Sequence, residues 1–269
     1  MRRPAPFRLF RLCSLDRVRR MADDLLPASP DEIAAAQNGR NFFRLKPFDA
    51  ATEEEKNSRC AHVERLRKEG TSDVSRWSAS ETHRPEWQSR GHLLARYARP
   101  GESIFEFGAG LTVVSSSLPS GCRYTGSDLA PLNGDLQTFD LNADRLEPIA
   151  GHDAALLSGV LEYVNDLNKV IEFFARCFKT ILCSYASADE WFETALVKRR
   201  YSGWVSDDGE ATFIARFERV GYSLTNKRDW QDQSLFRFDR RSDVTKDGDP
   251  SVGSVDETNR ATAVGNDKS

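Results

Sequence analysis

Short apolar runs separated by amphipathic segments fill the middle of the chain. These runs predict buried strands, and they cover residues 104–107, 122–128, 137–142, 153–159 and 180–185. The run at 153–159 is continuous, which is typical of a parallel strand covered on both faces. Between the strands, helices are expected at 86–98, 112–118 and 168–178. This alternation predicts βαβ units with right-handed crossovers and a mostly parallel sheet.

The last third of the chain loses this alternation. Helices are expected at 189–200 and 210–220, and strands at 222–227 and 234–238 then follow with no helix between them. Because only residues 228–233 join these two strands, they must run antiparallel. We therefore predict an α/β fold, with a Rossmann-like, doubly wound, seven-stranded and mostly parallel sheet. It should end in a C-terminal antiparallel hairpin and carry helices on both faces.

The two ends of the chain differ in composition from its middle. Residues 1–20 contain seven arginines and one acidic residue, which suggests either a mitochondrial-type presequence or an unstructured start ahead of Met21. Capped helices are expected at 29–37 and 52–69, and the charges of the second are interpreted as a solvated face. The expected organisation is a disordered basic segment over 1–28, a helical extension or cap over 29–99, one α/β domain over 100–239 and a disordered tail over 240–269.

Composition argues against several kinds of function. The 269 residues carry a net charge of −3, so we expect neither nucleic acid nor an anionic membrane as a partner. The five cysteines form no C-x-x-C pair, which argues against a disulfide framework and against a metal site. Mean hydropathy is −0.56, and no apolar run approaches the length of about 20 residues that crosses a bilayer. A soluble, cytoplasmic protein is expected.

The strand at 104–107 leads directly into a glycine turn that includes Gly108 and Gly110. Ligands of open α/β sheets bind outside the carboxyl ends of the strands, so this turn is where a nucleotide-like cofactor would lie. Tight strand-to-helix packing is the alternative reason for the two glycines. Asp128 ends the next strand, eighteen residues after Gly110. At that distance a carboxylate can accept hydrogen bonds from the two hydroxyls of a ribose.

Taken together, these features resemble the class I S-adenosylmethionine-dependent methyltransferases. Residues 106–110 are similar to the family's acid-x-Gly-x-Gly motif, and Asp128 is similar to its ribose-binding acid. Residues 139–142 resemble its adenine-contacting segment, and residues 158–163 resemble the motif after its fourth strand. The resemblance covers about half of the chain, from Pro100 to Phe238. One departure is Thr112, which stands where the family often has a third glycine.

The resemblance implies S-adenosylmethionine as the cofactor and assigns its binding residues. Gly108 and Gly110 would admit the methionine part, and Glu106 would orient its amino end through the turn. Asp128 would bind the ribose. The remaining assignments are Asp140 and the Leu141 backbone for the adenine, and Gly159 and Glu162 for the methyl-bearing end. Methyl transfer from a sulfonium depends mainly on alignment and the exclusion of water, so no metal is required.

The acceptor and any general base are less well defined. A hydroxyl acceptor needs a base within hydrogen-bond reach, whereas a neutral amine or a thiolate needs only positioning. The candidate bases are His83, Glu162, Tyr163, Tyr185 and Tyr201, and no other histidine has a partner cluster in sequence. Trp77 and Trp87 are expected either to close over a ligand or to pack the N-terminal helices onto the core.

The predicted function is therefore methyl transfer to a small-molecule or glycan-type acceptor, by a monomer or a homodimer. Residues 199–204, together with the helix and hairpin after them, are loosely similar to bacterial methyltransferases acting on small molecules or cell-surface sugars. One alternative is an NAD-dependent oxidoreductase, although Val113 stands where the third glycine of its fingerprint belongs. The other alternative is a non-catalytic binding protein with the methyltransferase fold.

Overall fold

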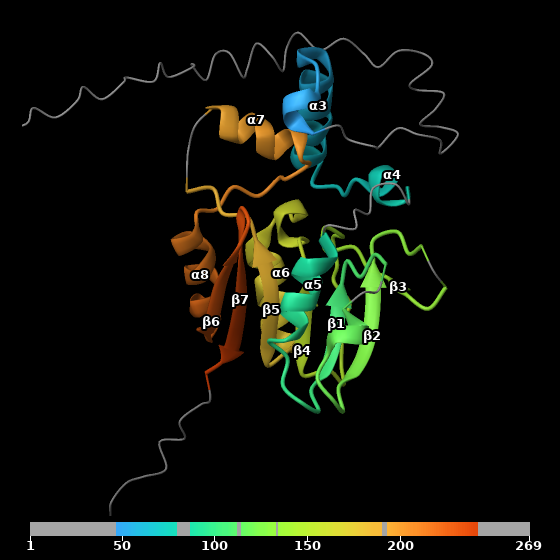
Figure 1. Ribbon diagram of the computed structural model, residues 1–269, viewed down its shortest axis with the longest axis vertical. Coiled ribbons are helices and arrows are strands. Elements are labelled where there is room, and N and C mark those ends of the chain that lie inside the picture. Colours follow the sequence, from blue (N-terminus) through green and yellow to red (C-terminus); the bar gives the residue numbers. More distant parts are fainter. Residues whose placement is uncertain (1–46, 80–86, 112–113, 133, 190–192, 242–269) are drawn as a thin grey trace, which may run out of the picture.

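A seven-stranded sheet forms the centre of the molecule (Figure 1), with the strand order β3-β2-β1-β4-β5-β7-β6. The computed structural model describes residues 47–79, 87–111, 114–132, 134–189 and 193–241. Four predictions therefore lie outside the described residues: the basic segment over 1–28, the helix at 29–37, the placement of His83 and the tail from residue 242 onward.

The topology of the sheet confirms the predicted α/β fold. Its strands are β1 (Ser103–Phe107), β2 (Arg123–Asp128), β3 (Gln137–Thr138), β4 (Ala154–Leu157), β5 (Thr180–Tyr185), β6 (Tyr222–Trp230) and β7 (Gln233–Arg240). β1 pairs in parallel with both β2 and β4, and β5 continues the parallel set beyond β4. β7 lies antiparallel between β5 and β6, so the C-terminal hairpin inserts a reversed strand into the sheet.

Helices cover both faces of the sheet, as predicted. On one face α5 (Gln88–Ala95) contributes Leu94, which packs with Ile104 of β1. On the other face α6 (Leu167–Cys177) packs on the alternate positions of β1, which include Phe107, and α8 (Glu210–Arg219) packs on β5, β6 and β7. Aromatic stacking is dense there, and the rings of Phe217 and Phe238 lie 4.2 Å apart at 11°. A fully buried side chain of this size stabilises the fold by about 1.5–3 kcal/mol.

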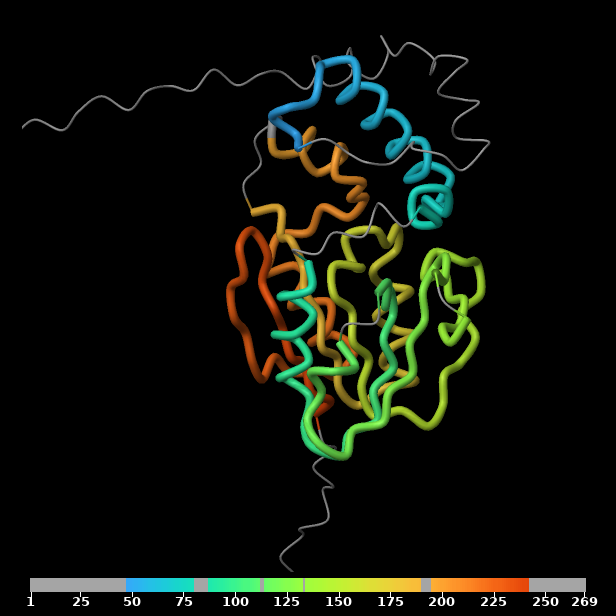
Figure 2. Tube along the Cα trace, turned by 45° about the vertical axis from the view of Figure 1, so that its right-hand side comes forward, coloured from blue at the N-terminus to red at the C-terminus, as the bar shows by residue number. Residues whose placement is uncertain are grey.

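Three further helices lie beyond the carboxyl ends of the parallel strands. These are α3 (Glu53–Glu69), α4 (Val74–Trp77) and α7 (Glu193–Tyr201). Figures 1 and 2 show α3 beside α7 above the sheet, although α7 follows α3 by more than a hundred residues. We call these helices and the connections 70–73 and 202–208 the cap. The cap therefore joins the N-terminal extension to a segment of the α/β domain.

The charges of α3 are only partly solvated, which corrects the interpretation of that helix. A capping box between Thr52 and Glu55 begins α3, as its sequence predicts. Arg59 of α3 is buried, and its Nη1 donates to Oδ2 of Asp73 at 2.8 Å. Arg200 of α7 is also buried and forms an ion pair with Glu64 of α3. Ionic contacts therefore hold α3 to the rest of the cap.

Two predicted elements are shorter than expected. In place of the helix at 112–118, the described residues form only the 3-10 turn η4 (Ser115–Ser117), a run of three serines, which are poor residues for a helix interior. In place of the strand at 137–142, β3 spans only Gln137–Thr138. There Asp140 Oδ1 accepts the N–H of Asn142 at 2.8 Å, which turns the chain out of the sheet.

Candidate active site

A cavity opens where the carboxyl ends of β1, β2 and β4 meet the cap. Phe107 pairs with Ser127 on one side and with Leu157 on the other. Gly108, Asp128 and Ser158 therefore leave the sheet at the same level, and all three line the cavity. The empty space is about 1140 Å³ when the part open to solvent is included.

The glycine turn after β1 is closed by hydrogen bonds to the end of β2. Gly110 N–H donates to Oδ2 of Asp128 at 2.8 Å, and Ala130 N–H donates to Oδ1 at 3.2 Å. Asp128 is only 6% exposed, yet it borders the cavity. Gly108 has φ +69°, and a Cβ atom there would lie 2.5 Å from Cγ2 of Val160. The turn thus requires glycine, and it holds the Asp128 carboxylate in a fixed orientation.

Glu106 lies beneath this turn and does not line the cavity, and neither does Gly110. The Glu106 carboxyl group is 2% exposed and accepts a hydrogen bond from the hydroxyl of Tyr124 at 2.5 Å. Burial raises the pKa of Glu106 to about 8, against the opposing effect of the Tyr124 hydrogen bond, and the charge of Asp128 adds to the rise. Glu106 could therefore affect a bound ligand only indirectly, by fixing the conformation of the glycine turn.

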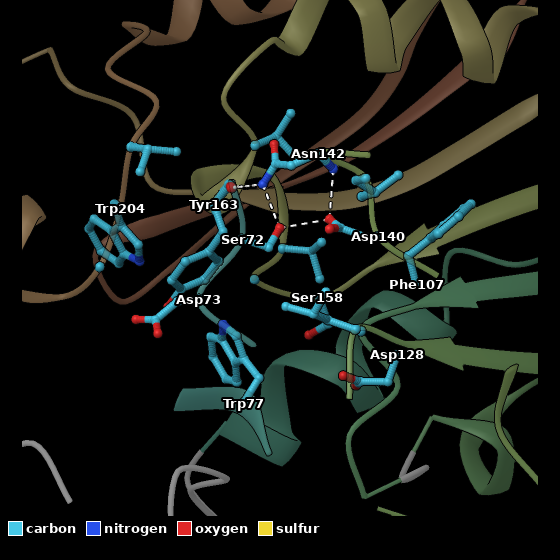
Figure 3. A pocket seen from close by; sticks show the side chains of 18 of the residues that line it. Ser72, Asp73, Trp77, Phe107, Asp128, Asp140, Asn142, Ser158, Tyr163 and Trp204 are labelled. Carbon is cyan, nitrogen blue, oxygen red and sulfur yellow. Dashed lines mark hydrogen bonds between the residues drawn. The ribbon is translucent and has the colours of Figure 1, made fainter. Parts of the chain in front are cut away.

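The segment after β3 contributes Asp140, Leu141 and Asn142 to the cavity wall. Ser72 of the cap donates from Oγ to Oδ1 of Asp140 at 2.7 Å and accepts from Nδ2 of Asn142 at 2.8 Å. The same Asn142 amide donates to the backbone oxygen of Tyr163 at 2.9 Å. Figure 3 shows this network, which joins the cap, the β3 exit and the β4 exit at one point.

At the end of β4, the buried side chain of Arg90 packs against Gly159. Gly159, with φ +70°, lines the cavity, and its N–H donates to Oγ of Ser184 at 2.8 Å. Arg90 of α5 is 6% exposed and also lines the cavity. It donates to Oγ of Ser158 at 3.0 Å, to the Ser158 backbone oxygen at 3.1 Å and to Oε1 of Gln233 at 3.0 Å. Burial lowers the pKa of Arg90. Its hydrogen bonds to described residues all go to uncharged groups.

Among the candidate bases within the described residues, only Tyr163 lines the cavity. Its hydroxyl donates to the Ser202 backbone oxygen at 3.5 Å. Glu162 is fully buried away from the cavity, where burial raises its pKa and Oε1 accepts the Ala186 N–H at 2.9 Å. Tyr185 and Tyr201 are buried elsewhere.

The cap side of the cavity is aromatic. Trp77 and Trp87 line it, together with Tyr163 and Trp204. Asp73 lies at the same side. Burial would raise the pKa of Asp73, but the hydrogen bond from His62 and the charge of Arg59 outweigh burial and hold that pKa well below its ordinary value.

Several of these residues are missing from the sequence-based predictions. They are Ser72, Asp73, Arg90, Asn142, Ser158, Trp204 and Gln233. Ser158 and Asn142 belong to segments that resemble motifs of the family. Their positions in these segments could have identified them as site residues. Nothing in the sequence identified Arg90 as a site residue, because an arginine inside a polar helix is ordinarily exposed to solvent. His62, His92 and His152 lie outside the cavity, and the described residues contain no metal-binding group of three or more His, Cys, Asp or Glu side chains.

Comparison with known proteins supports the fold through structure alone. No protein-family model and no curated protein matches the sequence. The mitomycin 7-O-methyltransferase MmcR superposes with a TM-score of 0.53 at 16% identity, over 81% of this chain and 74% of that one. A putative O-methyltransferase from Nostoc punctiforme PCC 73102 gives 0.49 at 9% identity, over 68% and 69%. Human N-acetylserotonin methyltransferase gives 0.45 at 13% identity, over 78% and 66%.

The chain has the fold of the class I S-adenosylmethionine-dependent methyltransferases. The assignment depends on the likeness to MmcR together with the parallel sheet and its inserted reversed strand β7. No helix in the described parts of the chain has the length and apolar character to cross a membrane.

Proposed function

We propose that this protein transfers a methyl group from S-adenosylmethionine to a small-molecule acceptor. The observation that carries the proposal is the Asp128 carboxylate, held at the rim of the cavity by the N–H of Gly110 at 2.8 Å. Its remaining lone pairs can accept two hydrogen bonds from a ribose. The proposal covers both small-molecule and glycan-type acceptors.

The residues around Asp128 fit the rest of the donor. Asp140 and the Leu141 backbone lie where the adenine would follow the ribose, and both border the cavity. On the other side of Asp128, Gly108 and Gly159 line the cavity, and the methionine part would lie along their backbone. Gly110, Glu106 and Glu162 would act indirectly, because they support these walls from behind.

The chain would contribute alignment and a dry environment to the reaction. When bound, the donor supplies a methyl carbon whose bond to sulfur breaks, leaving that electron pair on sulfur, as a lone pair of the acceptor forms the new bond. The β4 exit and the cap would hold the two reactants in line and exclude water. A protic acceptor also loses a proton, and Tyr163 is the one candidate base among the described residues that lines the cavity.

The proposal is tested by following S-adenosylhomocysteine formation with the whole protein. Cell extract would be divided by size, and each fraction incubated with S-adenosylmethionine. We expect product only with the low-molecular-mass fraction, and a methylated small molecule in that fraction by mass spectrometry. Turnover that depends only on the macromolecular fraction would contradict the small-molecule acceptor. Failure of the donor to bind would contradict the methyltransferase assignment itself.

A further inference from the structure

Four aromatic side chains from separate segments face the cavity on the side away from Asp128. Trp77 ends α4, Trp87 precedes α5, Tyr163 ends the 3-10 turn η5 (Leu161–Tyr163), and Trp204 follows α7. In Figure 3, Trp77, Tyr163 and Trp204 lie on one side of the view, and Phe107 and Asp128 lie on the other. We call these four residues the aromatic wall. We propose that the aromatic wall binds the acceptor and that the acceptor is a planar aromatic compound, uncharged or anionic.

The rings of the aromatic wall form a corner that suits a third ring. The centroids of Trp77 and Tyr163 lie 5.1 Å apart and their planes meet at 89°. Trp87 adds a third surface, 6.4 Å from Trp77 at 53°. A flat aromatic ligand placed in such a corner can stack on one ring and meet the edge of another, which are the two favoured aromatic geometries. A saturated ring of the same size can make neither contact.

Core packing does not account for these residues. The aromatic side chains that fill the core, such as Phe173 and Phe174, are fully buried in the cluster on one face of the sheet. All four residues of the aromatic wall are half-buried, and they belong to neither cluster. Their shared feature is the cavity that they border. Three of the four are tryptophans, which combine a large flat surface with a polar N–H.

The charges around the aromatic wall decide against a cationic ligand. The guanidinium of Arg76 lies 4.8 Å from the ring centroid of Trp77 and 5.5 Å from that of Tyr163. A cation therefore already interacts with these two rings, and Arg90 adds a second positive charge at the cavity. Three carboxylates of the described residues line the cavity, and each already has partners: Asp73 pairs with Arg59, Asp140 accepts from Ser72 and Asn142, and Asp128 accepts from Gly110 and Ala130. Another cation would meet repulsion that an uncharged or anionic ring avoids.

The inference depends on the proposed function, because it places the acceptor relative to a donor at Asp128. A binding experiment separates the two. The protein would be saturated with S-adenosylhomocysteine and titrated with 1-naphthol, with its fully saturated analogue decahydro-1-naphthol and with the cation 1-naphthylmethylammonium, while tryptophan fluorescence is followed. We expect 1-naphthol to bind at least tenfold more tightly than either of the other two compounds.

Variants then locate the binding. Trp77→Ala should weaken 1-naphthol binding at least tenfold, Trp77→Phe should weaken it less, and Trp204→Ala is a second test should Trp77→Ala fold poorly. Val74→Ala is the matched control, since Val74 lies on the same helix but is 48% exposed and outside the cavity. Equal affinity for 1-naphthol and its saturated analogue, or tighter binding of the cation, would overturn the inference while donor binding stands. Absence of S-adenosylhomocysteine binding would instead overturn the proposed function.

Discussion

At the scale of single residues, Arg90 and Gly159 depend on each other. A Cβ atom at position 159 would lie 2.2 Å from Nη2 of Arg90, and φ there is +70°. We expect Gly159→Ala to lower the free energy of unfolding by about 2–5 kcal/mol, since overpacking adds to the cost of a left-handed backbone. Urea denaturation monitored by circular dichroism measures this change.

A control separates the two causes. Gly151 has φ +81° with open space around it, so Gly151→Ala should cost only the backbone contribution of about 1–2 kcal/mol. In an Arg90→Ala background, the loss of unfolding free energy caused by Gly159→Ala should fall to the same backbone contribution of about 1–2 kcal/mol. If the two glycine substitutions cost the same in the wild-type background, the close approach of Arg90 is not what constrains position 159.

Glu106 makes a second prediction at this scale. Its pKa rises from 4.5 to about 8 on folding, mainly through burial, so the folded state holds a proton that the unfolded state loses. The stability that Glu106 contributes is therefore full below about pH 4.5 and is lost as the pH rises toward 8. Glu106→Gln should become progressively more stable than the wild type between pH 5 and pH 8. Denaturation at several pH values measures the difference, and a constant difference would contradict the buried, protonated carboxyl group.

At the scale of elements, one hydrogen-bond network holds the cap to the α/β domain. Ser72 bridges Asp140 and Asn142 across the mouth of the cavity. We expect Ser72→Ala to speed hydrogen exchange in α3 and α4 by severalfold and to raise the dissociation rate of S-adenosylhomocysteine, because the cap opens more often. Exchange mass spectrometry and stopped-flow fluorescence measure the two effects.

Ser78→Ala provides the control for this experiment. Ser78 follows α4, and among the described residues its hydroxyl bonds only within that segment, to the Val74 backbone oxygen at 2.8 Å. We expect it to leave both rates at the wild-type value. Exchange rates that are the same in Ser72→Ala and the wild type would show that the network does not secure the cap.

The sequence predicted elements well where each one carries its own signal. The apolar run at 180–185 coincides with β5, and the short connection at 228–233 correctly implied that β6 and β7 are antiparallel. Residues at strand ends, such as Asp128, could be predicted as site residues, because parallel neighbouring strands bring their carboxyl ends to the same edge of the sheet. β3 was mispredicted because the Asp140 side chain bonds the local backbone, which an apolar pattern does not reveal. η4 was mispredicted because its run of serines is poorly suited to a helix interior.

The cap could not be predicted in the same way. Its contacts join residues far apart in sequence, as in the hydrogen bond from Cys60 Sγ to the Val197 backbone oxygen at 3.5 Å. Trp204 and Ser72 reach the cavity only through such contacts between α3, α7 and the sheet. Single-residue patterns contain no information on pairs of this kind. A helical cap over 29–99 with Trp77 and Trp87 near a ligand was expected, but the contribution of α7 and Trp204 became visible only with the structure.

At the scale of the whole molecule, the cavity lies between two bodies that a donor would contact together. Asp128 and Gly159 belong to the α/β domain, whereas Ser72 and Trp77 belong to the cap. The central claim is that S-adenosylmethionine or its demethylated product binds here through the Asp128 carboxylate. Asp128→Asn tests that contact, since the amide keeps an oxygen for the Gly110 N–H, whereas its NH2 group replaces the oxygen that accepts from Ala130 and would accept from the ribose.

The most direct test is titration calorimetry of the whole protein with S-adenosylhomocysteine and with NADH. We predict binding of one S-adenosylhomocysteine per chain, no comparable binding of NADH, and a loss of about 1–3 kcal/mol in Asp128→Asn from the unpaired ribose hydroxyls. Asp144→Asn, at an exposed position outside the cavity, should bind like the wild type. Tight binding of NADH without S-adenosylhomocysteine, or an unchanged affinity in Asp128→Asn, would contradict the account.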